Sequence, residues 1–170
     1  QGQADIAAGL LRHVSDAFTE DPLRVFRVAR FAAQLSGFKV ADETQVLLMR
    51  MCSDRDLETL SAERVWQEFA KALAAPNPGR FFEVLEACGG LTYWLPECAG
   101  LALGSIPMHH SDPAARFALL PISAKGLAAI LARLRGPNRY AQLAADRHAH
   151  LSMLEQWPMV EPKELHRMLD

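Results

Sequence analysis

The sequence predicts an all-α protein, and three observations support this. The 170 residues include 27 Ala and 24 Leu but only 16 Val, Ile and Thr together. Unbranched side chains lose little rotamer freedom in a helix, whereas strands use β-branched ones. Helix-starting Ser, Asp and Pro alternate along the chain with helix-ending Gly and Pro. Because half of the residues are apolar, a chain of this length can bury one hydrophobic core.

These start and stop signals predict the following helices in chain order: 22–36, 42–52, 62–75, 78–88, 113–120, 123–135, 137–157 and 162–169. Residues 92–111 contain two Pro and two Gly, so they predict a connecting segment with at most one short helical turn. Residues 4–14 predict a helix that runs into a short extended piece at 11–14. A lone strand of that kind would need partners from outside the chain. Together with the first residue, which is not Met, this suggests a fragment of a longer protein.

The charge balance and the cysteines of the sequence exclude several functional classes and locations for this protein. The formal net charge is −2, and 14 of the 18 basic residues are Arg. This balance argues against a module that holds RNA through its phosphates alone. No stretch approaches the ~20 apolar residues of a membrane helix, and no secretory signal is visible. Cys52, Cys88 and Cys98 have no metal-binding spacing and indicate reduced thiols. We therefore expect a cytoplasmic protein that does not enter the membrane.

The helix predicted at 22–36 carries the most informative pattern. At ~100° per residue, one polar arc contains Glu20, Arg24, Arg27, Arg30 and Gln34, with Asp21 near its edge. Asp21 and Arg24 are three residues apart and would lie side by side. A carboxylate acceptor and a guanidinium donor can read the hydrogen-bonding edge of a base. The alternative is a first-turn Asp that is stabilised by the helix dipole and paired with Arg24.

Two ordered motifs resemble those of a known family. Glu20-Asp21-Pro22-Leu23-Arg24, continued by Val-Phe-Arg-Val-Ala-Arg and then Gly37-Phe38, resembles the EDxxR motif of class II tRNA nucleotidyltransferases, the CCA-adding enzymes. The next motif of the family is similar to Ser61-Ala-Glu63-Arg64-Val-Trp66-Gln-Glu68 together with Asn77-Pro78. Residues 2–14 resemble the end of the catalytic head domain. The resemblance covers about residues 1–98. It implies a remnant of the head (1–16), an all-α neck with the nucleotide-recognition helix (17–92) and a shortened body (93–170).

The resemblance also implies roles for these residues. The parent enzyme would add C, C and A to tRNA 3′ ends from CTP and ATP with Mg²⁺, and Asp21 and Arg24 would bind the Watson–Crick edge of the base. Glu20 would position the helix end, while Arg27 and Arg30 would face the triphosphate or the tRNA backbone, with structural ion pairs as the alternative. The catalytic Gly-Ser loop and Asp-x-Asp pair have no counterpart before residue 20. We expect no catalytic or metal-binding residue here, and weak nucleotide binding without transfer in the absence of the head domain.

Other conspicuous residues have simpler interpretations. Asp54-Arg55-Asp56 follows the recognition helix instead of preceding it, so we interpret it as a loop. The pairs His109-His110 and His148-x-His150 have poor chelating geometry. Because Arg64 and Glu68 are four residues apart, we expect them to form an ion pair on the helix surface. We expect Trp66 to be a core residue. Together with Glu63 they would brace the neck. Residues 116–120 resemble the lead into an HD phosphohydrolase motif whose metal ligands are absent.

Two alternatives remain at this point. A poly(A) polymerase shares the fold and an EDP-x-R segment, although that relative usually continues with Met-Leu-Arg-Ala instead of the Val-Phe-Arg-Val found at 25–28. The second alternative is a helical RNA-binding module that is derived from the enzyme and has no catalytic activity. Use of CTP by a complete parent would exclude the polymerase.

Overall fold

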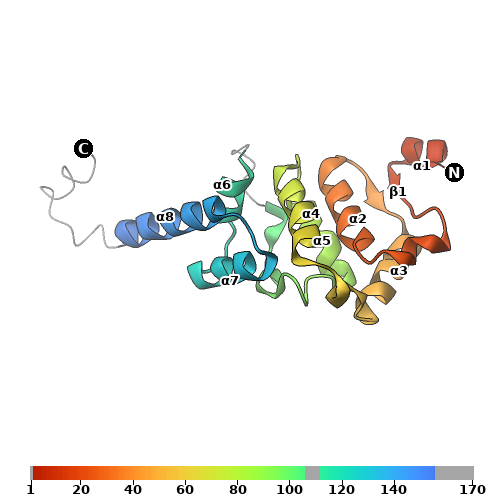
Figure 1. Ribbon diagram of the computed structural model, residues 1–170. Coiled ribbons are helices and arrows are strands. Elements are labelled where there is room, and N and C mark those ends of the chain that lie inside the picture. The colour runs from red at the N-terminus through yellow and green to blue at the C-terminus, as the bar shows by residue number, and fades with distance from the viewer. Residues whose placement is uncertain (1, 106–111, 156–170) are drawn as a thin grey trace, which may run out of the picture.

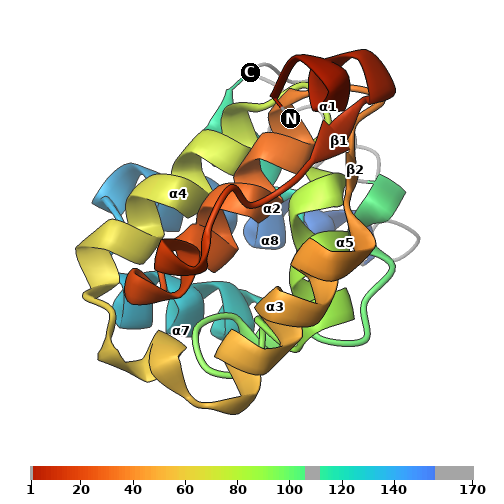
Figure 2. The same ribbon diagram turned by 90° about the vertical axis from the view of Figure 1, so that its right-hand side faces the viewer.

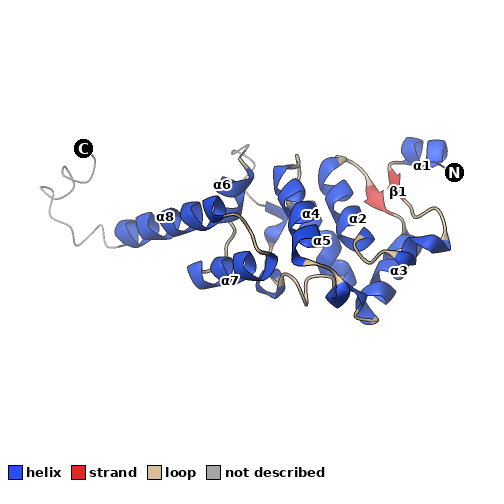
Figure 3. Cartoon of the chain, in the orientation of Figure 1, coloured by secondary structure: helices blue, strands red, loops and turns tan. Residues whose placement is uncertain are grey.

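The computed structural model describes residues 2–105 and 112–155, and confirms the all-α fold (Figure 3). In chain order the elements are α1 (Gly2–Ala8), β1 (Leu10–Leu11), the 3₁₀ helix η1 (Asp16–Glu20), α2 (Arg24–Gln34), β2 (Lys39–Val40), α3 (Asp42–Ser53), η2 (Asp56–Thr59), α4 (Ala62–Ala74), α5 (Gly79–Cys88), η3 (Pro96–Cys98), η4 (Leu103–Ser105), α6 (Pro113–Ala118), α7 (Ala124–Leu134) and α8 (Asn138–Glu155). The molecule is elongated, with α1 at one end and α8 extending toward the other (Figure 1). Within the described ranges, no helix combines the length and apolar character that crossing a bilayer requires.

Most helix ends follow the predicted signals. The Asp112 carboxylate accepts the Ala114 N–H at 3.1 Å at the start of α6, and the Ser123 hydroxyl accepts the Gly126 N–H at 3.2 Å at the start of α7. Gly89 ends α5 with a φ of 77°, a left-handed conformation that glycine adopts without strain. Residues 92–105 contain two 3₁₀ turns, η3 and η4, so the prediction of at most one was wrong. The helix predicted at 162–169 lies outside the described residues.

The short strands correct one prediction about the N-terminal segment. β1 pairs in parallel with β2, with Leu10 opposite Lys39 and Leu11 opposite Val40. The expectation that this strand needs a partner from outside the chain was therefore wrong. Gly37, with a φ of 86°, reverses the chain after α2 and brings β2 back beside β1. The N-terminal segment is thus held against the outer side of α2.

The core is one hydrophobic cluster that extends from α2 to α8. α2 packs between α4 and α5 (Figure 2). The rings of Phe26, Phe69 and Phe81 are fully buried, and Phe81 lies 6.4 Å from Phe26 and 5.8 Å from Phe69 between centroids. Phe117 of α6 continues the row, at 6.2 Å from Phe69. This aromatic row joins the helices around α2 to the C-terminal helices.

A buried arginine fastens α6 to the end of α4. The Arg116 guanidinium donates to the carbonyl oxygens of Leu73 at 2.7 Å and Ala75 at 2.6 Å. Carbonyls in the last turn of a helix have no partner within the helix, so a cation there satisfies them and complements the helix dipole. The sequence pattern at 116–120 gave no hint of this structural role.

Candidate functional site

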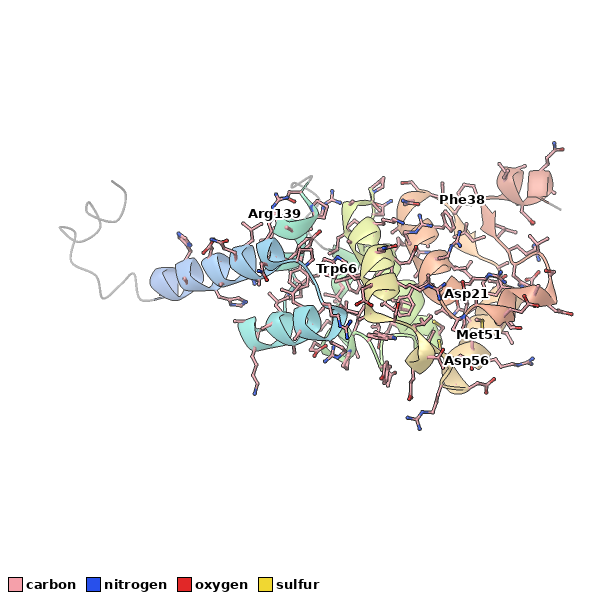
Figure 4. The ribbon with its side chains drawn as sticks, in the orientation of Figure 1. Asp21, Phe38, Met51, Asp56, Trp66 and Arg139 are labelled. Carbon is pink, nitrogen blue, oxygen red and sulfur yellow. The ribbon has the colours of Figure 1, made fainter. Side chains whose placement is uncertain are left out.

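The start of α2 holds the predicted base-reading carboxylate. Asp21 follows η1, and its Oδ1 accepts the Leu23 N–H at 3.1 Å. Nη2 of Arg64, on α4, donates to both carboxylate oxygens of Asp21, at 3.1 and 3.0 Å. Figure 4 shows Asp21 on the side of α4 opposite Trp66. Asp21 therefore binds across to α4 and not to Arg24, so the predicted Asp21–Arg24 alternative is not what the structure shows.

Arg24, one turn later, has different partners from Asp21. Its guanidinium donates to the Ala17 carbonyl oxygen of η1 and lies 5.7 Å from the centre of the Phe18 ring. A guanidinium over an aromatic face is favourable and keeps part of its donors available. Arg27 is exposed on the next turn, and Glu20 is exposed at the end of η1. Arg24 is thus bound to η1, whereas Asp21 is bound to α4.

A hollow of about 730 Å³ lies beside this face of α2, and we call it the α2 groove. Its walls come from α1, β1, η1 and α2. Apolar side chains such as Phe18, Val28 and Phe31 form most of the lining, and Arg24 and Arg27 bring positive charge into it. Glu20 and Asp21 lie outside this lining. The volume is within the ~300–1,000 Å³ of small-molecule sites, and an apolar wall with a few cations suits an anionic ligand with a flat ring.

Arg30 has a different environment from the other arginines of α2. It is 9% exposed, and its Nε donates to Oε2 of Glu68 on α4 at 2.5 Å. Its Nη1 donates to Gln34 at 2.6 Å, and the guanidinium lies 4.1 Å from the Phe31 ring centre. This burial leaves little surface for RNA, so of the two predicted roles the structure favours the ion pair. The predicted Arg64–Glu68 pair was wrong, because Arg64 binds Asp21 before α2 and Glu68 binds Arg30 on α2.

The remaining predicted residues lie away from the groove. Glu63 accepts from Arg135, which directly follows α7, at 2.6 Å, and its own backbone N–H and Arg135 together hold the pKa of this carboxyl below its usual range. Trp66 packs on the core, with its ring 4.8 Å from that of Tyr140, as predicted. Asp54 ends α3 and Asp56 begins η2, so this segment is a connection between helices. In the described part of the chain, no three His, Cys, Asp or Glu side chains gather in a way that could hold a metal ion.

The two histidine pairs were expected to have poor chelating geometry. His109-His110 lies outside the described residues. His148 is half-buried on α8, and Nδ1 of exposed His150 lies 2.6 Å from the Asp146 carbonyl oxygen one turn before it.

Sequence reasoning missed two groove residues that precede η1. The backbone N–H of His13 donates to the buried Thr44 hydroxyl at 3.0 Å, and His13 Nδ1 lies 2.9 Å from the same oxygen. Arg12 binds Asp5 at 2.9 Å and also Glu43. Both Arg12 and His13 line the groove. Both belong to residues 2–14, which resemble the end of the catalytic head, but their position depends on the pairing of β1 with β2, which local sequence does not reveal.

Comparison with known proteins places these features in context. A family model described as "Probable RNA and SrmB-binding site of polymerase A" matches residues 37–101. A "Multifunctional CCA protein" of Methylobacillus flagellatus is 56% identical over 96 residues, which are 56% of this chain and 23% of that protein. A "CCA-adding enzyme" of Pseudomonas putida is 43% identical over 153 residues, covering 85% of this chain and 42% of that enzyme.

A solved structure shares the fold. It is described as a CCA-adding enzyme in complex with CTP and has a TM-score of 0.62 at 17% identity. The match covers 95% of this chain and 45% of that chain. The chain therefore spans less than half the length of each of these relatives. In sequence and in fold, this chain corresponds to a C-terminal portion of the CCA-adding enzymes.

Proposed function

We propose that this chain is the nucleotide-selecting and tRNA-binding portion of a CCA-adding tRNA nucleotidyltransferase. The whole protein would add C, C and A to tRNA 3′ ends from CTP and ATP. The observation that carries this proposal is the α2 groove, which Arg24 and Arg27 enter from one face of the helix that Asp21 precedes. The sequence relatives that are named for CCA addition support the proposal.

Asp21 and Arg24 would divide the reading of the base. A carboxylate offers about four acceptor positions. Among the described residues, Oδ1 of Asp21 already accepts from Leu23 and Arg64, and Oδ2 accepts from Arg64 alone. Oδ2 can thus take one more donor, such as the exocyclic amino group of cytosine or adenine. Arg24 would supply donors to the acceptors of the same base edge after leaving the Ala17 carbonyl.

The neighbouring groups would complete the nucleotide site. Phe18 and Phe31 line the groove and offer flat apolar surfaces to the base. Arg27, exposed one turn beyond Arg24, would contact the triphosphate. Glu20 would fix the end of η1 and with it the approach to α2.

The remainder of the reaction would need groups outside this chain. Nucleotidyl transfer uses Mg²⁺ to activate the attacking oxygen and to neutralise the triphosphate. The described side chains do not fit such ions, because they offer no cluster of three ligands. We propose that a head domain of the longer protein supplies the metal ligands, and that residues 17–92 and 93–170 act as its neck and shortened body. Binding of tRNA by this portion is supported by the RNA-binding family model over residues 37–101.

A poly(A) polymerase portion is the second candidate, because the matching family model is described for polymerase A. The two enzymes differ in their use of CTP. Binding of CTP and ATP with similar affinity would favour the CCA-adding enzyme, and binding of ATP alone would favour the polymerase.

Calorimetric titration of the chain with each of the four nucleoside triphosphates tests the proposal. We expect weak binding of CTP and ATP and weaker binding of UTP and GTP. Arg24→Ala should lower the CTP affinity by about tenfold or more, since a bidentate side-chain-to-base contact discriminates by roughly 1–3 kcal/mol. Arg55→Ala is the matched control, because its side chain is 77% exposed beside η2 and does not line the groove. Equal CTP binding by wild type and Arg24→Ala would contradict the assignment.

Incubation with Mg²⁺, CTP, ATP and tRNA that lacks its 3′ end tests the second expectation. We expect no extension by this chain alone. Measurable extension would show that catalysis does not depend on groups outside it.

A further inference from the structure

Two cysteines from different helices lie close together where α3 packs on α5, away from the α2 groove. Cys52 lies in the last turn of α3 and Cys88 at the end of α5, and these two helices pack together. Their sulfur atoms are 3.7 Å apart. Cys88 is 5% exposed, whereas Cys52 is half-buried and reaches the surface. A small solute can therefore approach the pair from the Cys52 side.

The two sulfurs differ in their contacts and in the direction in which their pKa values are shifted. The Cys52 S–H donates to the Cys88 sulfur, and this contact, helped by the Gly90 backbone N–H, holds the pKa of Cys88 below its usual range. The same contact raises the pKa of Cys52. A Cβ atom at Gly90 would lie 3.3 Å from the Cys88 sulfur, so the glycine leaves room beside it. Thiolates are the reactive form of cysteine.

Cys98 provides an internal contrast. It is 1% exposed, and burial raises its pKa to about 12. It therefore stays a protonated thiol that solutes do not reach. Any oxidation that follows access and thiolate character should spare it.

We propose that Cys52 and Cys88 are an oxidation site that forms a reversible intramolecular disulfide with hydrogen peroxide. One sulfur of the pair attacks a peroxide oxygen, the O–O bond breaks, and a sulfenic acid and one water form. The other sulfur then attacks the sulfenic sulfur, the S–O bond breaks, and the S–S bond and a second water form. Two thiols and one peroxide thus give one disulfide and two waters, and a dithiol reductant reverses the change.

The disulfide would join residues 36 positions apart in the chain. It would fix α3 to α5, which packs in turn against α2. Closing a loop of this length restricts the unfolded chain, so oxidation should raise the melting temperature. This oxidation site does not depend on the proposed nucleotide site.

Thiol counting by mass spectrometry tests the proposal on the full chain. The protein is treated with a few equivalents of hydrogen peroxide, denatured and alkylated with iodoacetamide. We expect the number of alkylated cysteines to fall from three to one, the mass of the monomer to fall by two hydrogens, and a Cys52–Cys88 peptide to appear. Dithiothreitol should restore three.

Two variants make the outcome specific. Cys98→Ser should still form the disulfide and keep no alkylated cysteine after oxidation. Cys52→Ser, at the half-buried position, should keep its helical circular dichroism and two alkylated cysteines. Disulfide-linked dimers, loss of Cys98 at the same rate as the pair, or sulfinic acid at Cys52 without a cross-link would each overturn the proposal.

Discussion

The two sides of α2 hold the same kind of residue in opposite situations. Toward α4, Arg30 is buried and binds Glu68 at 2.5 Å. Toward the α2 groove, Arg24 is half-buried and Arg27 is exposed. The arginines follow one another at intervals of three residues, so their spacing gives no sign of this difference. The neighbour that covers each turn decides whether an arginine stabilises the fold or is available to a ligand.

Removal of the buried partner should have the largest effect. Glu68→Ala leaves the Arg30 guanidinium buried without a counter-charge, and we expect a loss of about 3–5 kcal/mol in the free energy of unfolding. Gln34 and Phe31 still contact this guanidinium, which favours the lower end of the range. Urea denaturation followed by circular dichroism measures the change.

The double variant Arg30→Met with Glu68→Leu is the control for that experiment. It removes both charges and keeps similar volume, so it should recover most of the lost stability. A double variant as unstable as Glu68→Ala would mean that packing around the pair, and not the unpaired charge, causes the loss.

Removal of a groove arginine should act on binding and spare the fold. For Arg27→Ala we expect about a tenfold loss of CTP affinity, comparable to one hydrogen bond to a charged group. Affinity for cytidine should change little, because the nucleoside has no triphosphate. The free energy of unfolding should stay within about 0.5 kcal/mol of wild type, since the side chain is exposed. Equal losses for CTP and cytidine would place Arg27 at the base instead.

The helices were predictable from the sequence because their signals are local. Asp112 and Ser123 cap the helices that follow them, and Gly89 ends α5, as the pattern indicates. The pairing of β1 with β2 was not predictable, because it depends on the path of the chain through the whole of α2. A strand of two residues also carries almost no pattern of its own.

The candidate site was predictable only in part for the same reason. The motif residues Asp21 and Arg24 were identified, but their partners come from α4 and η1. Helix spacing suggested that Arg64 pairs with Glu68, and both side chains instead bind groups near α2. Charge pairs between helices require the packing of those helices, which spacing within one helix does not contain.

The ion pair between Arg133 and Glu97 is partly exposed and lies away from α2, and its contribution to stability should depend on pH. Arg133 donates to both oxygens of Glu97, at 2.8 and 2.6 Å, and holds the pKa of Glu97 below its usual range despite partial burial. A carboxyl with a lowered pKa in the folded state stabilises above its unfolded pKa, and this contribution disappears as the pH falls through the folded value.

Glu97→Gln should therefore lower the stability by about 1 kcal/mol at pH 7, and by progressively less as the pH falls through the folded pKa of the Glu97 carboxyl. Unfolding curves of both proteins across this pH range measure the difference. A difference that is constant with pH would show that the carboxylate charge contributes nothing.

A small effect on stability should also come from the exposed ion pair on the α4 side. Asp21 and Arg64 have side chains that are 30% and 49% exposed, so Arg64→Ala should cost less than about 1 kcal/mol, and less still in high salt. Relative to this small effect on stability, the effect of Arg64→Ala on the discrimination between nucleotides should be large. Without Arg64 the Asp21 carboxylate keeps the Leu23 N–H and loses the contact that orients Oδ2.

We therefore expect Arg64→Ala to reduce the ratio of CTP to UTP affinity while its affinity for UTP stays near that of wild type. Arg64→Lys, which retains a positive charge beside Asp21, should restore part of this ratio. A loss of affinity that is the same for all four nucleotides would mean that the carboxylate does not read the base. Such a result would leave Asp21 as part of the contact between the start of α2 and α4 alone.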